Sequence, residues 1–205
     1  MQDEEFTPAD GHLPAVLRQF EITHGRALEI GCGSAANVIW LARLGFECTG
    51  IDLASAALRL ARDQASAAGC SPLLIRGAFP DGIPEGALAN GGYDFVFDRG
   101  VLELVTAPAQ RRKFLKLVAQ LLSSGGIYYS LIAKRERRKL PGGGTRWTSS
   151  EIRKAISPFL RILLVKPVPL DPSNRASPSH WMCIMKPYVK RRITVDRRFP
   201  FIFLR

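Results

Sequence analysis

Short apolar runs alternate with amphipathic segments along most of the chain. Apolar runs bounded by glycine, proline or polar residues predict strands, and segments with apolar residues three or four positions apart predict helices. The predicted strands span residues 26–30, 46–51, 72–76, 93–98, 127–132, 159–165 and 180–185. The predicted helices span 36–44, 54–68, 109–122 and 148–158, and a shorter amphipathic helix carries Val16, Leu17 and Phe20 on one face.

Several helix ends carry their own signals in the sequence. Gly69 and the pair Gly125–Gly126 are expected to end the helices that precede them. Thr148 and Glu151 have the spacing of a capping box, which predicts a helix start at this point.

This order of elements predicts a Rossmann-like, doubly wound α/β fold. Strands that alternate with helices imply a mostly parallel sheet with helices on both faces, here with seven strands. The two final strands are joined by a loop, so the last strand is expected to be antiparallel. We expect one domain over residues 1–187, with a strap and helix at 1–25 and a basic, glycine-rich loop at 134–147, followed by a basic and aromatic tail at 188–205.

The first predicted strand ends in a glycine loop. Gly31 and Gly33 allow a tight turn with positive φ and let a ligand lie against bare backbone. The second strand leads to Asp52, at a distance where a carboxylate can accept hydrogen bonds from ribose hydroxyls. Together these features predict a ligand that contains adenosine, whereas glycines that serve only packing are the alternative.

Glu29 distinguishes among adenosine-containing ligands. A pyrophosphate at a helix N-terminus is incompatible with a carboxylate two residues before the first glycine. Ala36 also replaces the third glycine of the dinucleotide motif, which argues against a nicotinamide cofactor. S-adenosylmethionine fits better, because it carries a sulfonium and an ammonium and no phosphate.

Residues beyond the carboxyl ends of the strands are the other candidates, because ligands of open α/β sheets bind there. Asp98 ends an apolar strand, where an unpaired carboxylate would be costly. It is expected to meet the ligand's ammonium or the substrate, or else to pair with Arg99 or cap the next helix. Methyl transfer from a sulfonium depends on alignment of donor and acceptor, so no catalytic base is assigned and Asp98 stays the one catalytic candidate.

Several segments together resemble one family. Leu28–Gly33 with Ile51–Asp52 resembles the signature of class I S-adenosylmethionine-dependent methyltransferases. The segment 93–102 and the strap motif Thr7-Pro8-x-Asp10-Gly11-x-x-Pro14 are similar to the thiopurine S-methyltransferase and related small-molecule group. Gly142–Trp147 is similar to the substrate loop of that group.

Two positions depart from the group's pattern. Ala9 stands where the strap usually carries tryptophan, and Ala78 stands where an acidic residue commonly meets the adenine amino group. Backbone amides of Ala78 and Phe79, or the Asp81 carboxylate, would have to substitute. The absence of an Asn/Asp-Pro-Pro-aromatic tetrapeptide after the fourth strand argues against methylation of nucleic-acid bases.

The resemblance implies a methyltransferase that moves a methyl group from S-adenosylmethionine to a small molecule, at sulfur or another soft heteroatom. The expected cofactor residues are Glu29, Gly31, Cys32, Gly33, Asp52, Leu53, Ala78, Phe79, Asp98 and Arg99. The expected substrate residues are His12, Arg146 and Trp147, and no metal ligand is expected.

The charge of the chain leaves two alternative functions open. The net charge is +11, and residues 134–205 alone carry 18 Lys and Arg against 4 Asp and Glu. A basic half can contact nucleic acid, an anionic membrane or an anionic substrate, or can be a solvated surface. The alternatives are therefore a methyltransferase acting on RNA or protein, and a catalytically silent cofactor-binding domain.

The cysteines, the apolar runs and the first residues indicate the cellular compartment of the protein. The four cysteines have no C-x-x-C spacing, which predicts reduced thiols in a cytoplasmic protein and no zinc site. No apolar run reaches the roughly 18 residues of a membrane helix, and the acidic start is unlike a signal peptide. We expect a monomer or weak dimer.

Overall fold

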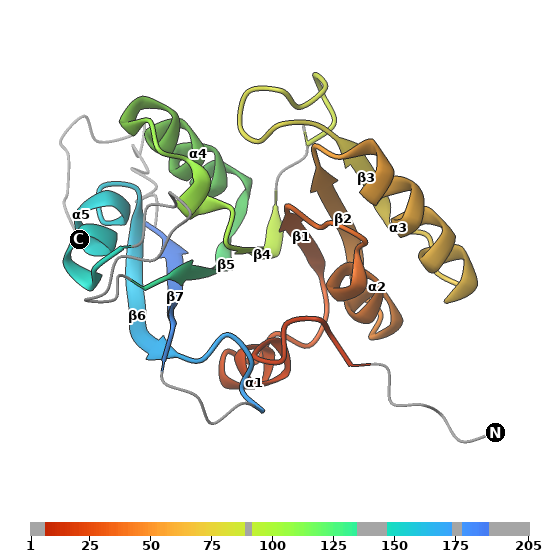
Figure 1. Cartoon of the computed structure of the whole chain (residues 1–205), viewed down its shortest axis with the longest axis horizontal. Helices are drawn as coiled ribbons and strands as arrows, with labels where there is room; N and C mark the ends of the chain where they lie inside the picture. Colours follow the sequence, from red (N-terminus) through yellow and green to blue (C-terminus); the bar gives the residue numbers. More distant parts are fainter. Residues whose placement is uncertain (1–6, 89–91, 135–146, 174–177, 189–205) are drawn as a thin grey trace, which may run out of the picture.

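The computed structural model describes residues 7–88, 92–134, 147–173 and 178–188 of the 205-residue chain. They form one seven-stranded sheet with the order β3-β2-β1-β4-β5-β7-β6 (Figure 1). The strands are β1 (Arg26–Ile30), β2 (Glu47–Asp52), β3 (Leu73–Arg76), β4 (Tyr93–Arg99), β5 (Leu122–Ala133), β6 (Leu160–Val168) and β7 (His180–Pro187).

The predicted sheet topology is confirmed. β1 to β5 pair in parallel, and β7 is antiparallel to both β5 and β6. The strand order reverses between β1 and β4, because the chain builds outward to β3 and then returns to the other side of β1. In open α/β sheets, the carboxyl ends of the strands at this reversal form the usual ligand crevice.

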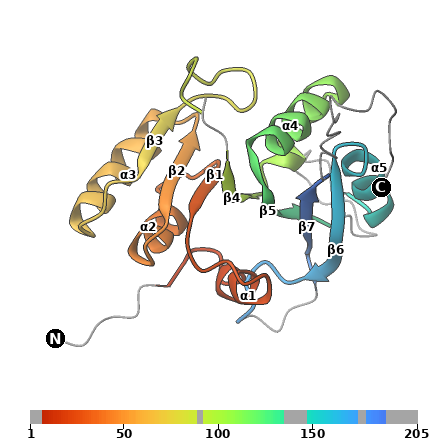
Figure 2. The ribbon, with the colours of Figure 1, turned by 180° about the vertical axis from the view of Figure 1, so that it is seen from behind.

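Helices cover both faces of the sheet, as predicted (Figures 1 and 2). One face packs against α1 (Leu13–Gln19), α2 (Ala36–Arg43) and α3 (Ser55–Ala67). The other packs against α4 (Pro108–Leu121) and α5 (Ser149–Ile156), and the short 3-10 helix η1 (Leu102–Leu104) follows β4. None of the helices in these ranges is long and apolar enough to span a membrane.

Side chains of the central strands point alternately to the two faces of the sheet and so contribute to the hydrophobic core on each face. In β4, Phe95 and Phe97 point into the core under α1 to α3, whereas Val96 points into the core under α4 and α5. Both faces are buried, so the strand is apolar at nearly every position. This explains why residues 95–97 are consecutive apolar residues.

Several boundaries differ from the prediction. α4 ends at Leu121, and Gly125–Gly126 lie inside β5 instead of ending the helix. A Cβ at Gly126 would lie 2.6 Å from the Tyr93 carbonyl oxygen, so this glycine permits close approach of β5 to β4. The capping box is confirmed, because the Glu151 N–H donates to Thr148 Oγ1 and the Thr148 N–H donates to the Glu151 carboxylate.

Candidate cofactor site

The glycine loop joins β1 to α2 in a tight turn. The N–H groups of Gly31 and Cys32 both donate to the Ile51 carbonyl, at 2.8 and 2.9 Å. Gly31 has φ +78°, and a Cβ there would lie 2.4 Å from Val101 Cγ2. Both the conformation and the space therefore require glycine. The Cys32 side chain is buried, and burial raises the pKa of its thiol to about 12.

Asp52 closes this loop from the end of β2. Its Oδ2 accepts a hydrogen bond from the Gly33 N–H at 2.8 Å, and its Oδ1 accepts from the Ala54 N–H at 2.8 Å. Each carboxylate oxygen has a second lone pair, so Asp52 retains capacity to accept from a diol. A Cβ at Gly33 would meet nothing within 4 Å, so the loop is open on this side. The neighbouring Leu53 is 66% exposed, which offers an apolar surface beside the carboxylate.

Glu29 is a buried carboxyl group with one oxygen available. It is 3% exposed, and its Oε1 accepts a hydrogen bond from Asn37 Nδ2 at 2.7 Å. Its Oε2 is buried and has no hydrogen-bond partner among the described residues. Burial raises the pKa of Glu29 to about 8, with smaller contributions from Asp10 and Asp52, whereas Asn37 and Arg99 oppose the shift.

The N-terminal strap is hydrogen-bonded to Asn37, the residue that contacts this carboxyl group. Asp10 is 1% exposed and donates its N–H to Asn37 Oδ1 at 2.8 Å. The Asp10 carboxylate accepts from the Tyr129 hydroxyl at 2.7 Å and from the His12 N–H at 3.0 Å. Buried polar groups in a core require partners. Asn37 and Tyr129 are polar side chains at otherwise apolar core positions, and they are the signal in the sequence for this network.

His12 lies in the strap but faces the protein. It is 7% exposed, and its Nε2 lies 2.9 Å from the Pro169 carbonyl oxygen. This contact ties the strap to the residues that follow β6. His12 was predicted to touch substrate, and the contact seen here is a structural one.

Asp98 caps the turn after β4, which is one of the alternatives to a ligand contact. The side chain is fully buried, and its Oδ1 accepts from the N–H groups of Val101 and Leu102 at the start of η1. Its Oδ2 accepts from the Tyr128 hydroxyl at 2.6 Å. Burial raises the pKa of Asp98, and these hydrogen bonds oppose the shift. Asp98 therefore caps a turn, and the expectation that it meets a ligand's ammonium is corrected, because the side chain is fully buried and its oxygens accept three hydrogen bonds inside the protein. Arg99, the next residue, is exposed at the end of β4.

The segment after β3 places its residues in different environments. Ala78 is exposed, and its carbonyl accepts from the Gly82 N–H. The Phe79 ring packs on Phe114 with centroids 4.7 Å apart, so this side chain faces the core. Asp81 pairs with Lys113 at 3.3 Å. The backbone of 78–79 and the half-exposed Asp81 carboxylate stay the candidates for a ligand contact here.

Trp147 lies away from Glu29, on the opposite face of the sheet. It is buried, and the Arg111 guanidinium lies 4.2 Å from its ring centroid. Both residues line a cavity of about 420 Å³ between α4 and α5. Arg146, most of the predicted substrate loop and the tail from residue 189 lie outside the described residues.

Comparison with known proteins agrees with this geometry. Residues 27–126 match the family model described as a methyltransferase domain. The match spans 100 of the 205 residues. The match includes the glycine loop, Glu29 and Asp52.

The curated relatives that match this chain are ubiquinone biosynthesis O-methyltransferases. The ubiquinone biosynthesis O-methyltransferase of Paracidovorax citrulli is 31% identical over 113 residues, which cover 55% of this chain and 45% of the relative. The corresponding enzyme of Caulobacter vibrioides is 32% identical over 55% of this chain and 42% of its own length. The chain thus spans less than half the length of these relatives. They are O-methyltransferases, so the thiopurine subgroup is not supported by them.

Solved structures show the same fold. The glycopeptide N-methyltransferase MtfA, in complex with S-adenosyl-L-methionine, matches with TM-score 0.68 and 13% identity over 90% of this chain and 96% of that one. A methyltransferase from Clostridium acetobutylicum matches with TM-score 0.69 and 12% identity over 87% and 90% of the two chains. At this identity, the likeness concerns the fold alone.

Proposed function

We propose that this protein binds S-adenosylmethionine at the carboxyl ends of β1 and β2 and transfers its methyl group to a small molecule. One observation carries the proposal: Glu29 Oε2 is buried without a partner among the described residues, beside a glycine loop closed by Asp52. A buried carboxyl group with an unused acceptor is costly unless a donor or cation meets it. The ammonium of S-adenosylmethionine provides one.

Each part of the cofactor has a matching group in the chain. The second lone pairs of Asp52 suit the ribose hydroxyls, and the exposed face of Leu53 suits the adenine ring. Backbone amides at 78–79 take the place of the missing acidic residue. Arg99 is exposed near Glu29 and suits the cofactor carboxylate. Bound S-adenosylmethionine supplies an electrophilic methyl group on a sulfonium.

The chain's own contribution is alignment. A methyl transfer of this type needs the acceptor in line with the departing sulfur, and well-held reactants gain about 7–11 kcal/mol in this way. We propose a sulfur or other soft atom as the acceptor, on the resemblance to the thiopurine group. The curated relatives favour oxygen, so both atoms belong in the test.

The setting of the reaction is part of the proposal. Cys32, Cys48, Cys70 and Cys183 are free thiols, which fits a reducing compartment such as the cytoplasm. We propose that the enzyme works there as a monomer or weak dimer.

A transfer assay with methyl-labelled S-adenosylmethionine tests the activity. The full chain is incubated with an aryl thiol, a catechol, total RNA or a protein mixture, and label in each fraction is counted. We expect label in the thiol or the catechol. Label only in RNA or protein supports the alternative substrate class, and no label in any fraction, with cofactor binding intact, indicates a silent binding domain.

A further inference from the structure

Asn37 connects two parts of the site. It is 5% exposed and lies in the first turn of α2. Its Nδ2 donates to Glu29 Oε1 at 2.7 Å, and its Oδ1 accepts from the Asp10 N–H at 2.8 Å. These partners fix the amide orientation, because the backbone N–H of Asp10 requires an acceptor. Flipping the amide would set two N–H groups against each other.

We propose that Asn37 is a positioning residue that holds the Glu29 carboxyl group for the cofactor and couples this carboxyl to the N-terminal strap. This inference rests on the proposed function of the site. It adds a specific role for a residue outside the glycine loop and for the strap segment 10–12. The strap and the cofactor would then stabilise each other's bound positions.

Charge around Glu29 explains why it needs such a partner. The carboxyl group faces Asp10 from the strap and Asp52 from β2, both of which disfavour its ionised form. Arg99 from β4 favours the ionised form, and Cys32 in the glycine loop is a buried neutral thiol. The Asn37 amide is the direct hydrogen-bond donor to the carboxyl group. A donor of this kind favours the ionised state that a cationic ligand requires.

The other end of Asn37 reaches the strap. Asp10 is held by the Asn37 carbonyl through its backbone and by Tyr129 and the His12 N–H through its side chain. His12 in turn contacts the Pro169 carbonyl. Loss of the Asn37 carbonyl would leave the buried Asp10 N–H without an acceptor, which would loosen the strap.

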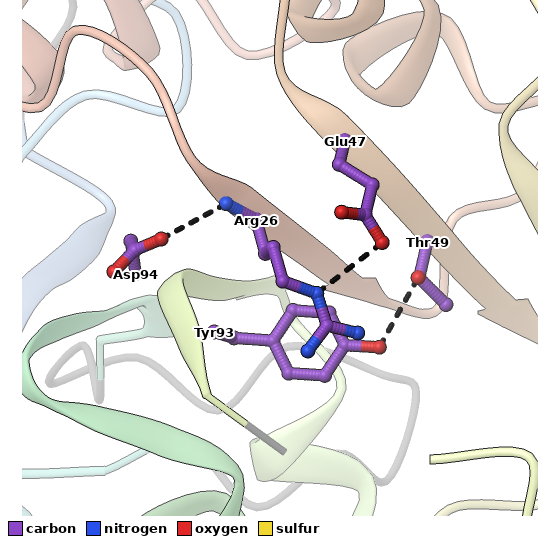
Figure 3. Close-up of polar contacts among 5 residues, drawn as sticks. All are labelled: Arg26, Glu47, Thr49, Tyr93 and Asp94. Atoms are coloured by element: carbon purple, nitrogen blue, oxygen red, sulfur yellow. Dashed lines mark hydrogen bonds and ion pairs between the residues drawn. The ribbon is translucent and has the colours of Figure 1, made fainter. Parts of the chain in front are cut away.

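Two variants separate these roles. Asn37→Leu keeps the volume and removes both hydrogen bonds. Asn37→Asp keeps an oxygen for the Asp10 N–H but sets a second carboxyl group against Glu29. Tyr93→Phe is the matched control, since it removes a buried hydrogen bond of 3.1 Å to Thr49 Oγ1 at the opposite end of β4 from Asp98 (Figure 3).

Calorimetry with S-adenosylhomocysteine from pH 6 to pH 9 tests the role toward the cofactor. We expect both Asn37 variants to bind at least about tenfold more weakly than wild type at pH 7. The loss should shrink at higher pH, because the variants need more alkaline conditions to ionise Glu29. Tyr93→Phe should bind within about twofold of wild type. Variants of Asn37 that fold and bind like wild type at every pH would overturn the inference.

Hydrogen exchange of the strap amides tests the coupling without ligand. Asn37→Leu should exchange the Asp10 amide faster than wild type, whereas Asn37→Asp and Tyr93→Phe should protect it as wild type does. Equal protection in Asn37→Leu would overturn the coupling. If wild type fails to bind S-adenosylhomocysteine, the proposed function fails, and this exchange measurement still decides the link to the strap.

Discussion

At the scale of single residues, Glu29 combines deep burial with one unpartnered oxygen within the described part of the chain. Its pKa of about 8 in the folded protein lies above the ordinary value of 4.5. The fold therefore favours the protonated form. The stability that this form contributes is complete below pH 4.5 and is lost as the pH rises toward 8.

Glu29→Gln should remove the decrease in stability between pH 4.5 and pH 8, because the amide keeps the acceptor for Asn37 and never ionises. We expect its free energy of unfolding to exceed that of wild type by on the order of 2–4 kcal/mol at pH 8.5, with little difference at pH 5. Urea denaturation at both pH values measures it. The exposed Glu47→Gln serves as the control and should show no such change. An equal difference for Glu29→Gln at both pH values would contradict the raised pKa.

Gly31 gives a second prediction at this scale. Gly31→Ala forces a side chain into positive φ and against Val101, and we expect a loss of about 2–4 kcal/mol in unfolding free energy. Gly69→Ala is matched to it, since Gly69 also has positive φ at +68° but open space around a Cβ. It should lose only about 1 kcal/mol. Equal losses in thermal denaturation would show that Val101 gives way and that backbone conformation alone requires Gly31.

At the scale of elements, Asp98 fixes the turn between β4 and α4. Asp98→Ala would leave the N–H groups of Val101 and Leu102 and the buried Tyr128 hydroxyl without their acceptor, which should cost about 2–5 kcal/mol of stability. Asp98→Asn keeps one carbonyl oxygen for the N–H groups, and its S-adenosylhomocysteine affinity should stay within about threefold of wild type. A selective loss of affinity in a fully stable Asp98→Asn protein would restore the ligand-binding role.

The start of α5 depends on its capping box. Thr148→Ala removes the acceptor for the Glu151 N–H, and we expect a loss of about 0.5–2 kcal/mol in unfolding free energy. Ser150→Ala, at an exposed position in the same helix turn, is the control and should change stability by less than about 0.5 kcal/mol. Similar losses in both variants would contradict a specific role for the cap.

Local sequence patterns predict the helices and strands, but they do not predict which side chains of distant segments contact one another. The apolar runs and the glycine loop placed all seven strands and the acids at 29 and 52, because these signals lie within a few residues of one another. Asp98 illustrates the limit: its partner Tyr128 lies on the neighbouring strand. The link from Asn37 to Asp10 likewise joins segments that only the folded chain brings together. The residues on either side of a position do not show which distant side chain will contact it in the folded protein.

At the scale of the whole molecule, the described residues place Glu29, a buried carboxyl group with an unpartnered oxygen, and the carboxylate of Asp52 at the reversal of a seven-stranded sheet. The strap is hydrogen-bonded to Asn37 on one face of the sheet, and the α4–α5 cavity lies on the other. The strongly basic segments fall mainly outside the described residues, so their partner stays a prediction.

Calorimetric titration of the full chain with S-adenosylhomocysteine at pH 8.5 tests the central claim most directly. The wild type should bind with a dissociation constant in the micromolar range, and Glu29→Gln should bind at least about tenfold more weakly, because it loses a charge-assisted hydrogen bond to the ammonium. No heat of binding at hundreds of micromolar ligand, or equal affinity in the two proteins, would contradict the account.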